Sequence, residues 1–572
     1  MDKQLLVLGC SETKRKCNGL LPAIDRYDGS SYRVLRNYLR AREWPSNLSV
    51  AILSAKYGLV GGFTEIENYN ERMTKARAAE LVPSCIDTLN TWANWHSSMY
   101  FSLGKDYLPA VIPAIENNFN AKVELFGGPI GMKLSQIKGL LEQTRSPVRR
   151  RTTLPEPGSG RVTYFLPDWD DLLDEHFNFE SDKFSGATRK ERQDKHCCIL
   201  MKPKRLADGI LVSLAQHVTS KGPLKRIIGI ESDSLAPKNL RNQFGLDEDQ
   251  SVFGDCGAFS YVNNEMPAIS VEQAIALYDL YGFDFGASVD HIPVPVIVRD
   301  GKKIELKQDE RIARVEITRQ NAERFITIAK KRHVGFMPVG TIQSLTAAGY
   351  ADSACYYHDL GYRHLALGGL VPLPDAAVEE IVVKVMSVIS SLKPRPWVHL
   401  FGIFRPKLQA RFRELKVDSF DSATYFRKAW LRSDQNYLAT NGKWYAALRV
   451  PMTSDARTRK KLDQSGVDLA TMEVEESHVL KLLSRFDHDE VGINEVLDAV
   501  VEYDERLTRT SDAHSLRKKY KETLRDRPWS HCDCPFCREA GIHVLIFRGA
   551  NRNKRRGAHN TLMLYGSLEN RS

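Results

Sequence analysis

The sequence predicts an α/β protein in which a small Rossmann-like domain precedes a closed (β/α)8 barrel. Three observations support this prediction. Short apolar runs alternate with amphipathic helical stretches along most of the 572 residues, which is typical of parallel sheets. A segment without periodicity interrupts this alternation, and a longer second series of apolar runs follows it. A chain of this length is also expected to form several domains.

The first unit spans residues 1–142. Its apolar runs LLVLGC, LSVAILS and SMYFSLG are separated by helical segments such as SYRVLRNYLRAREW. This pattern predicts a small domain with a largely parallel sheet. Residues 143–160 contain RSPVRRRTTLPEPGSG, which is rich in Arg, Pro, Gly and Ser and is therefore predicted to be a linker.

The second series, residues 161–450, contains eight candidate strands, the number that a (β/α)8 barrel requires. An open doubly wound sheet is the main competitor, but the G-x-G-x-x-G fingerprint of that fold is absent from the sequence. Residues 451–530 are charged and helical, and are predicted to form an insertion. The candidate strands are VTYFLPDW (162–169), RIIGIES (226–232), SVFGDCGAF (251–259), FDFGASVD (283–290), VGFMPVG (334–340), HLALGGLV (364–371), WVHLFGIF (397–404) and SFDSATYF (419–426).

Three of the ten cysteines crowd into HCDCPFC near the C-terminus. Three thiolates and one imidazole make a closed tetrahedral zinc site, which is structural because no ligand position remains for water. Residues 531–572 are therefore predicted to be a zinc-binding segment that completes the barrel domain. The predicted ligands are Cys532, Cys534, Cys537 and His559, with His531 and His543 as competing fourth ligands and free loop cysteines as the alternative.

Composition and charge narrow the class of protein. Hydrophobic residues make up 42% and charged residues 27% of the chain, and no apolar run approaches the ~18 residues of a membrane span. The N-terminus has no long apolar signal-peptide region, so a cytoplasmic location is expected. The net charge of +10 and basic runs at 145–151, 202–205, 457–461 and 551–556 favour a polyanion partner, although such runs are often only solvated surface.

Three aspartates lie at the ends of predicted barrel strands: Asp255, Asp290 and Asp421. A single strand-end aspartate is commonly a helix cap or turn residue. Three at one barrel mouth, where active sites of this fold lie, predict chemistry. One carboxylate can attack or stabilise an anomeric carbon while another moves a proton. The residues therefore predict a hydrolase or transferase that acts on a glycosyl bond.

Six short segments follow one another along the chain: GDCGAFSY, ASVDHIP, LALGGL, HLFGI, DSFDSA, and CDCPFC with a later HN. Together they resemble the tRNA-guanine transglycosylase superfamily over residues 161–572, apart from the helical stretch. The resemblance implies a zinc-containing (β/α)8 barrel that exchanges guanine in a nucleic acid for a 7-deazapurine. Asp421, in the pattern D-x-F-D, is the implied nucleophile that forms a covalent glycosyl ester. Asp255 is implied to move the proton on the departing and incoming bases.

The resemblance also implies residues that recognise the base. Asp290 matches an aspartate that accepts hydrogen bonds from the purine N–H edge. Cys256 and the pair Gly368 and Gly369 are expected beside the base. The sequence departs from the family at GFMPVGTI, where Pro338 and Val339 stand in place of a glutamine.

The segment FLPDWDDLLDEHFNF (165–179), the leading domain, GASVDHIP and RGAHN resemble the DpdA-like branch, which inserts 7-deazaguanine bases into DNA. The expected substrates are DNA and a base such as preQ0, and a partner ATPase of a DNA-modification system is left open. No motif reports how a pocket treats the 2′-OH, so tRNA is the alternative substrate. A catalytically silent nucleic-acid-binding subunit would need none of the three aspartates. A nucleobase hydrolase would need water at the covalent intermediate.

The leading domain contains LGCSETKRK, LSAKYGLV and ENYNERM, which resemble small DUF6884 or YaaA-like domains. Strand-end side chains of these motifs could line a phosphate- or nucleobase-binding mouth. They could equally be caps and packing residues. The candidate residues are Cys10, Ser11, Lys14, Ser54 and Tyr57.

Overall fold

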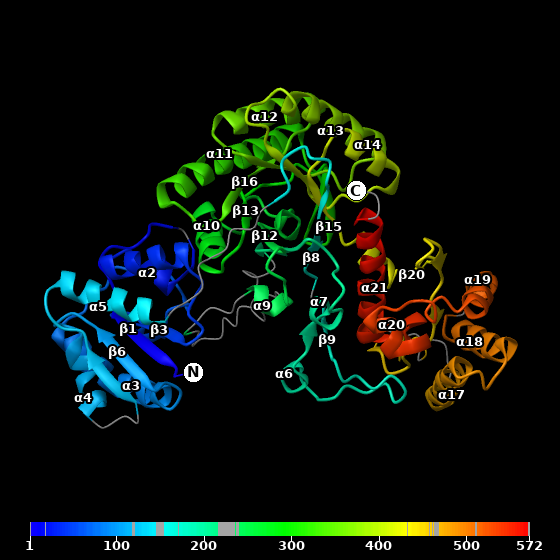
Figure 1. Ribbon diagram of the computed structural model, residues 1–572, viewed down its shortest axis with the longest axis horizontal. Helices are drawn as coiled ribbons and strands as arrows, with labels where there is room; N and C mark the ends of the chain where they lie inside the picture. The colour runs from blue at the N-terminus through cyan, green and yellow to red at the C-terminus, as the bar shows by residue number, and fades with distance from the viewer. Residues whose placement is uncertain are drawn as a thin grey trace.

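The computed structural model describes residues 2–569 apart from 18, 117–120, 145–153, 170, 216–234, 236–239, 432, 457, 460–461, 463–467 and 509–511. Figure 1 shows the blue N-terminal domain at one end, the green barrel in the middle, and the orange and red C-terminal helices at the other end. No helix among the described residues is long and apolar enough to cross a membrane.

The N-terminal domain is a five-stranded sheet between two layers of helices, as its alternating pattern predicts. The strand order is β4-β3-β1-β6-β7, and only β4 is antiparallel to its neighbour. Separate hydrophobic clusters lie on the two faces of the sheet. The strands are β1 (Gln4–Gly9), β3 (Leu48–Ser54), β4 (Gly58–Gly61), β6 (Ser98–Ser102) and β7 (Lys122–Leu125), and the main helices are α2 (Ser30–Ala41), α3 (Lys75–Ala93) and α5 (Ile130–Gln143).

The N-terminal domain contacts the barrel through a short loop. The amide of Gln273, on barrel helix α10 (Val271–Leu280), donates a hydrogen bond to the carbonyl of Leu20 at 2.8 Å. The Cys17 thiol lies 3.2 Å from the hydroxyl of Ser270, the residue that caps the same helix. The loop after β1 is thus held against α10.

The second unit is a closed barrel of eight parallel strands, which confirms the predicted fold class. The last strand pairs with the first, so the barrel has no free edge. The strands are β8 (Thr163–Pro167), β11 (Gly209–Ser213), β12 (Ser251–Asp255), β13 (Phe285–Ala287), β16 (Met337–Ile342), β17 (His364–Leu367), β18 (Trp397–Leu400) and β19 (Ser419–Asp421).

Aromatic side chains fill the barrel interior. Phe165, Phe253, Phe285 and Trp397 are at most 1% exposed and form one cluster, with the Phe285 and Trp397 rings stacked at 5.7 Å. Because strand side chains alternate between faces, the neighbouring residues point outward and pack against the helices. The barrel interior is therefore a packed core.

Seven of the eight predicted barrel strands are confirmed, and one assignment differs. The predicted strand 226–232 lies outside the described residues, and the second barrel strand is β11, Gly209–Ser213. This strand has five residues and follows the turn-rich segment KPKRLAD, so its apolar run is short. The run 226–232 has a similar apolar pattern, and the sequence alone did not separate the two candidates.

Beyond the barrel, the helices described before the cysteine-rich segment include α17 (Leu469–Asp487), α18 (Ile493–Thr508) and α19 (Asp512–Asp526). The chain then forms α20 (Pro535–Ala540) and the long α21 (Gly549–Glu569), drawn red in Figure 1. The short strand β22 (Leu448–Arg449) pairs with β23 (Ile546–Phe547), which ties the end of the barrel region to the cysteine-rich segment.

Two of the basic runs, 202–205 and 551–556, form ion pairs with acidic residues of the same chain. Arg552, Arg555 and Arg556 of the run 551–556 are at most 1% exposed, and they bind Asp182, Glu539 and the carbonyl of Ala429 respectively. The three basic residues of the run 202–205 pair with Asp247, Asp533 and Asp249. The expectation of a polyanion contact is therefore wrong for 551–556, because burial removes its charges from the surface. The run 145–151 lies outside the described residues, and 457–461 lies only partly within them.

Candidate active site

Asp421 ends β19 and points into the mouth of the barrel. In the sequence Ser-Phe-Asp, Phe420 faces the outer hydrophobic core, so the pleat turns Ser419 and Asp421 inward. The Asp421 carboxylate is 6% exposed. Its Oδ1 atom accepts a hydrogen bond from the backbone N–H of Gly402 at 2.7 Å and lies 3.1 Å from Nε2 of His399. The sequence around Asp421 is apolar, but its carboxylate is accommodated because His399 on β18 and the backbone N–H of Gly402 in the following loop contact it.

Asp255 ends β12 at the same mouth and is partly exposed. Burial, and next the negative charge of Asp290, raise the pKa of its carboxyl to about 8, and Asp421 contributes in the same direction. Asp255 is therefore mainly protonated at neutral pH. A protonated carboxyl beside a carboxylate is the arrangement that general acid catalysis and nucleophilic attack require together.

Asp290 lies three residues after β13 at the centre of a hydrogen-bonded group. The Cys256 thiol donates to its Oδ1 at 2.8 Å, and the Gln343 amide donates to its Oδ2 at 2.6 Å. Burial raises the pKa of the Asp290 carboxyl, whereas these two hydrogen bonds lower it. The Tyr261 hydroxyl, which donates to the Asp290 carbonyl at 2.8 Å, holds the loop in place.

The glycine pair after β17 leaves space for Gln343. A Cβ atom on Gly368 would lie 2.2 Å from Nε2 of Gln343, and one on Gly369, which has φ +73°, would lie 2.5 Å from Oε1. Larger residues there would displace the amide. The structure therefore brings Asp290, Cys256, Gly368 and Gly369, the residues that the resemblance implies beside the base, close to one another.

Gln343 is a site residue that the sequence analysis missed. Pro338 and Val339, which stand where a glutamine was expected, lie inside β16, and Gln343 follows the end of that strand. Its side chain is 2% exposed, and its Oε1 has no hydrogen-bond partner among the described atoms. The available signal was an amide directly after the apolar run MPVGTI. An unpaired buried amide oxygen is costly unless a ligand donates to it.

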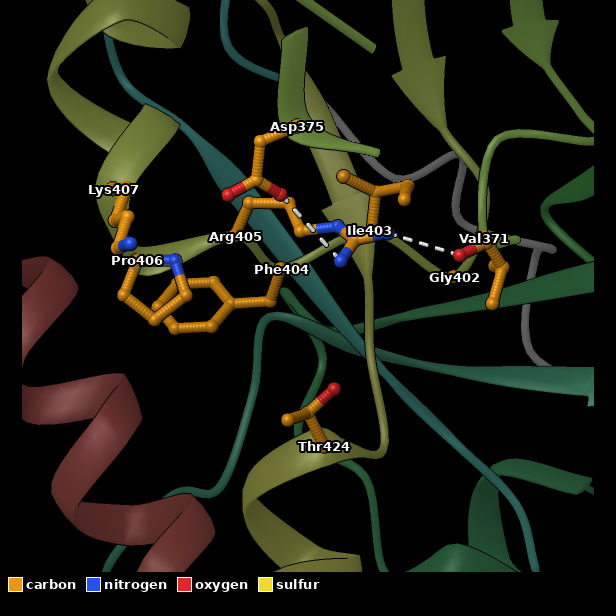
Figure 2. Close-up of a pocket in the computed structure, with 9 residues that line it drawn as sticks. All are labelled: Val371, Asp375, Gly402, Ile403, Phe404, Arg405, Pro406, Lys407 and Thr424. Carbon is orange, nitrogen blue, oxygen red and sulfur yellow. Dashed lines mark hydrogen bonds and ion pairs between the residues drawn. The ribbon is translucent and has the colours of Figure 1, made fainter. Parts of the chain in front are cut away.

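A cavity of about 420 Å³ opens beside Asp421, between the loops that follow β17, β18 and β19. Figure 2 shows Thr424 on the side opposite Asp375 and Arg405, with Phe404 among the lining residues. Arg405 donates to the carbonyls of Val371 and Leu373 at 2.9 and 3.0 Å, and so fixes two of these loops to each other. Gly402 lines this cavity and also binds Asp421, so the cavity adjoins the candidate nucleophile.

The three cysteines near the C-terminus and His559 form a group that could hold a metal ion. The Sγ atoms of Cys532, Cys534 and Cys537 lie 3.6, 3.5 and 3.4 Å from Nδ1 of His559. A tetrahedral ion with bonds of about 2.3 Å to sulfur and about 2.0 Å to nitrogen would place sulfur and nitrogen about 3.5 Å apart. Nε2 of His559 lies 2.7 Å from the carbonyl of Leu438, which leaves Nδ1 to face the thiols.

The competing histidines lie elsewhere. His543 stacks on Phe179 with ring centroids 5.6 Å apart and lies 3.3 Å from the Ser484 hydroxyl, and His531 is exposed. Neither belongs to the cysteine group, so the structure favours His559 as the fourth member of this group.

The candidate residues of the N-terminal domain divide into two groups. Ser54 and Tyr57 meet at Tyr69: the Ser54 and Tyr69 hydroxyls are 2.8 Å apart, and the Tyr57 and Tyr69 rings pack edge to face at 5.5 Å. The Lys14 ammonium lies 4.5 Å from the Tyr69 ring centroid. Cys10 instead contacts the Tyr107 hydroxyl at 3.1 Å, and the Ser11 hydroxyl donates to the nearby Thr13 carbonyl.

Known proteins resemble both units. Residues 5–139 match the model of a family of unknown function, DUF6884. The chain is 32% identical over 414 residues to a DNA-guanine transglycosylase of Salmonella montevideo, which covers 72% of this chain and 97% of that protein. It is 28% identical over 256 residues to a tRNA-guanine(15) transglycosylase of Methanococcus aeolicus, and 30% identical over 193 residues to one of Pyrococcus abyssi.

The extent of these matches differs. The two tRNA-guanine(15) transglycosylases are covered over only 35% and 30% of their lengths. The Salmonella protein is matched almost from end to end. This chain therefore belongs to the guanine transglycosylase family that includes the Salmonella DNA-guanine transglycosylase.

Proposed function

We propose that this protein exchanges guanine in DNA for a 7-deazaguanine base such as preQ0, through a covalent ester between Asp421 and the sugar. The main support for this proposal is that two carboxyl groups at the mouth of the barrel, those of Asp421 and Asp255, have different environments. Asp421 is held by the hydrogen-bond donor Gly402, whereas the raised pKa of Asp255 keeps it protonated. A positioned carboxylate can attack C1′ while a neutral carboxyl protonates the departing guanine.

The base-binding side of the site supports a purine substrate. Asp290 offers carboxylate oxygens to the N–H edge of the base, and Oε1 of Gln343 is an unpaired acceptor beside it. The backbone next to Gly368 and Gly369 leaves room for a flat ring. A base can reach this buried group only after it leaves its stack, which costs a few kcal/mol in a duplex.

DNA is favoured over tRNA by the extent of the similarity. The relative that acts on DNA is matched over 97% of its length, whereas the tRNA-acting relatives are matched over about a third of theirs. Transfer to tRNA is the second candidate activity. Exchange of one N-glycosidic bond for another is nearly balanced in free energy, so the chemistry itself needs no nucleoside triphosphate.

The test of this function is the incorporation of labelled base. Labelled guanine, and separately labelled preQ0, would be incubated with the protein and with duplex DNA, single-stranded DNA or tRNA. Label in DNA but not in tRNA is expected. Label in tRNA alone would replace the proposal with the second activity. Label in neither substrate would contradict base exchange by this chain alone and would direct attention to a partner such as an ATPase.

The raised pKa of Asp255 predicts a pH dependence for guanine release. The protonated form is the acid that the leaving base needs, and it is lost as the pH rises through about 8. The single-turnover rate of guanine release should therefore be level below pH 7 and fall about tenfold per pH unit well above pH 8. Asp255→Asn should release guanine on the order of a hundredfold more slowly, without this decline. An unchanged alkaline limb in Asp255→Asn would assign the titration to another group.

The ion proposed for the cysteine group is zinc. Cys532, Cys534, Cys537 and His559 would hold it, with Nε2–H of His559 donating to Leu438. With four protein ligands it would have no open position, so its contribution is to folding rather than to base exchange.

The N-terminal domain is proposed as a binding module for a phosphate or nucleobase. In an open α/β sheet, ligands bind beyond the carboxyl ends of the strands. Lys14, Ser54, Tyr57 and Tyr69 lie together beyond the ends of β1 and β3. An aromatic surface with a lysine beside it suits a planar base that carries a phosphate.

A further inference from the structure

His399, on β18, lies directly beside the proposed nucleophile. Its ring is fully buried, and Nε2 lies 3.1 Å from Oδ1 of Asp421. On the other side of the ring, Nδ1 lies 2.7 Å from the Ser419 hydroxyl. Ser419 and Asp421 are both inward-facing residues of β19, so one strand contacts both nitrogens of the imidazole.

The surroundings fix the position and the tautomer of this ring. His399 stacks on Phe253 at 4.8 Å and packs against the edge of Phe401 at 4.7 Å, so it cannot turn away from Asp421. In the neutral imidazole one nitrogen is a donor and the other an acceptor. Because the Asp421 carboxylate can only accept, Nε2 carries the ring proton and donates a hydrogen bond to Asp421, and Nδ1 accepts one from the Ser419 hydroxyl.

Two donors therefore converge on one oxygen of Asp421. Nε2–H of His399 and N–H of Gly402 both bind Oδ1, at 3.1 and 2.7 Å. This pairing leaves Oδ2 as the oxygen that is available to attack. When Oδ2 forms the ester, Oδ1 changes from a carboxylate oxygen to a neutral carbonyl oxygen. Hydrogen bonds to a charged acceptor are about twice as strong as those to a neutral one, so both donors favour the free carboxylate over the ester.

We infer that His399 is a positioning residue that stabilises the free Asp421 carboxylate relative to the glycosyl ester, and so limits accumulation of the covalent intermediate. This inference rests on the proposed covalent mechanism. In the first step the Oδ2–C1′ bond forms, the bond from C1′ to guanine breaks, and guanine takes the proton of Asp255. In the second step the incoming base bonds to C1′, Oδ2 leaves as carboxylate, and the base returns a proton to Asp255. His399 keeps its proton throughout.

The test measures an equilibrium, because a general loss of activity would not distinguish this role. Purified protein and target DNA would be equilibrated with increasing guanine and no other base, and the covalent adduct would be quantified on a denaturing gel. Guanine reverses adduct formation, so the concentration that halves the adduct reports the balance between ester and free carboxylate. His399→Phe keeps a buried aromatic ring and removes the donor, and should raise that concentration about tenfold.

Two variants keep the result interpretable. His399→Gln retains an N–H donor and should move the guanine midpoint back toward the wild-type value. His364→Phe is the matched control, because the half-buried His364 packs on Phe285 and Trp397 and, among the described residues, makes no hydrogen bond or ion pair with Asp421. Its midpoint should not change. An unchanged midpoint in a folded His399→Phe protein would overturn the inference while the covalent mechanism stood. Base exchange by wild type without any adduct would overturn the covalent mechanism itself.

Discussion

Asp421→Asn is expected to reduce base exchange by at least about a thousandfold, with no covalent adduct on DNA. The neutral amide is isosteric with the carboxylate, but it is not a nucleophile toward C1′. Binding of DNA should change little, since the lost group is one buried side chain. The measurement is single-turnover release of labelled guanine, together with adduct formation on a denaturing gel. Release at the wild-type rate would exclude Asp421 as the nucleophile.

Asp418 provides a matched control from the same motif. It lies three residues before Asp421 and is also buried, but it faces the opposite end of the barrel. It pairs with Arg395 at 3.1 Å and accepts hydrogen bonds from the backbone N–H groups of Val398 and Gly158. Asp418→Asn should cost about 2 kcal/mol of stability and leave the rate of guanine release per folded molecule unchanged. This result would assign a structural role to Asp418 and a chemical role to Asp421.

The barrel was predictable because its strands are apolar runs that end in polar residues. In SVFGD and SFD, the apolar run predicts the strand, and the terminal aspartate predicts which residue lies at the mouth of the barrel. β11 was not predictable in the same way. Its run GILVS and the later run RIIGIES have similar apolar patterns, and only the pairing with β8 and β12 identifies the strand.

Part of the site depends on contacts that no local pattern reports. Gln343 was missed because its role depends on Asp290, 53 residues earlier in the sequence, and on the space above Gly368. His399 was missed because a histidine within a buried strand is usually a packing residue, and only its distance from Asp421 identifies it. For the run 551–556 the local pattern was misleading. A basic run suggests an exposed surface, but its arginines are buried and pair with Asp182 and Glu539.

Cys534→Ser is expected to remove the bound metal ion and to destabilise the C-terminal segment by several kcal/mol, on the order of 5. The Cys534 side chain is fully buried, and it also caps α20 by accepting a hydrogen bond from the backbone N–H of Cys537. Loss of the thiolate would leave the other ligands of the site buried without their cation. Metal content by atomic emission and the thermal unfolding midpoint are the measurements. One zinc ion per chain is expected in the wild type and none in the variant.

Cys355→Ser is the control for a general effect of cysteine replacement, because Cys355 is half-buried on α12 (Ala347–Asp359) and lies outside the cysteine group. It should retain the ion and the unfolding midpoint. A Cys534→Ser protein with a full complement of zinc and an unchanged midpoint would contradict the assignment. The stability change should also reach the active site, because Asn560, next to His559 on α21, donates to the carbonyl of Tyr425 at 3.2 Å. Tyr425 follows Asp421 by four residues, so loss of the ion is expected to loosen the loop that follows the proposed nucleophile.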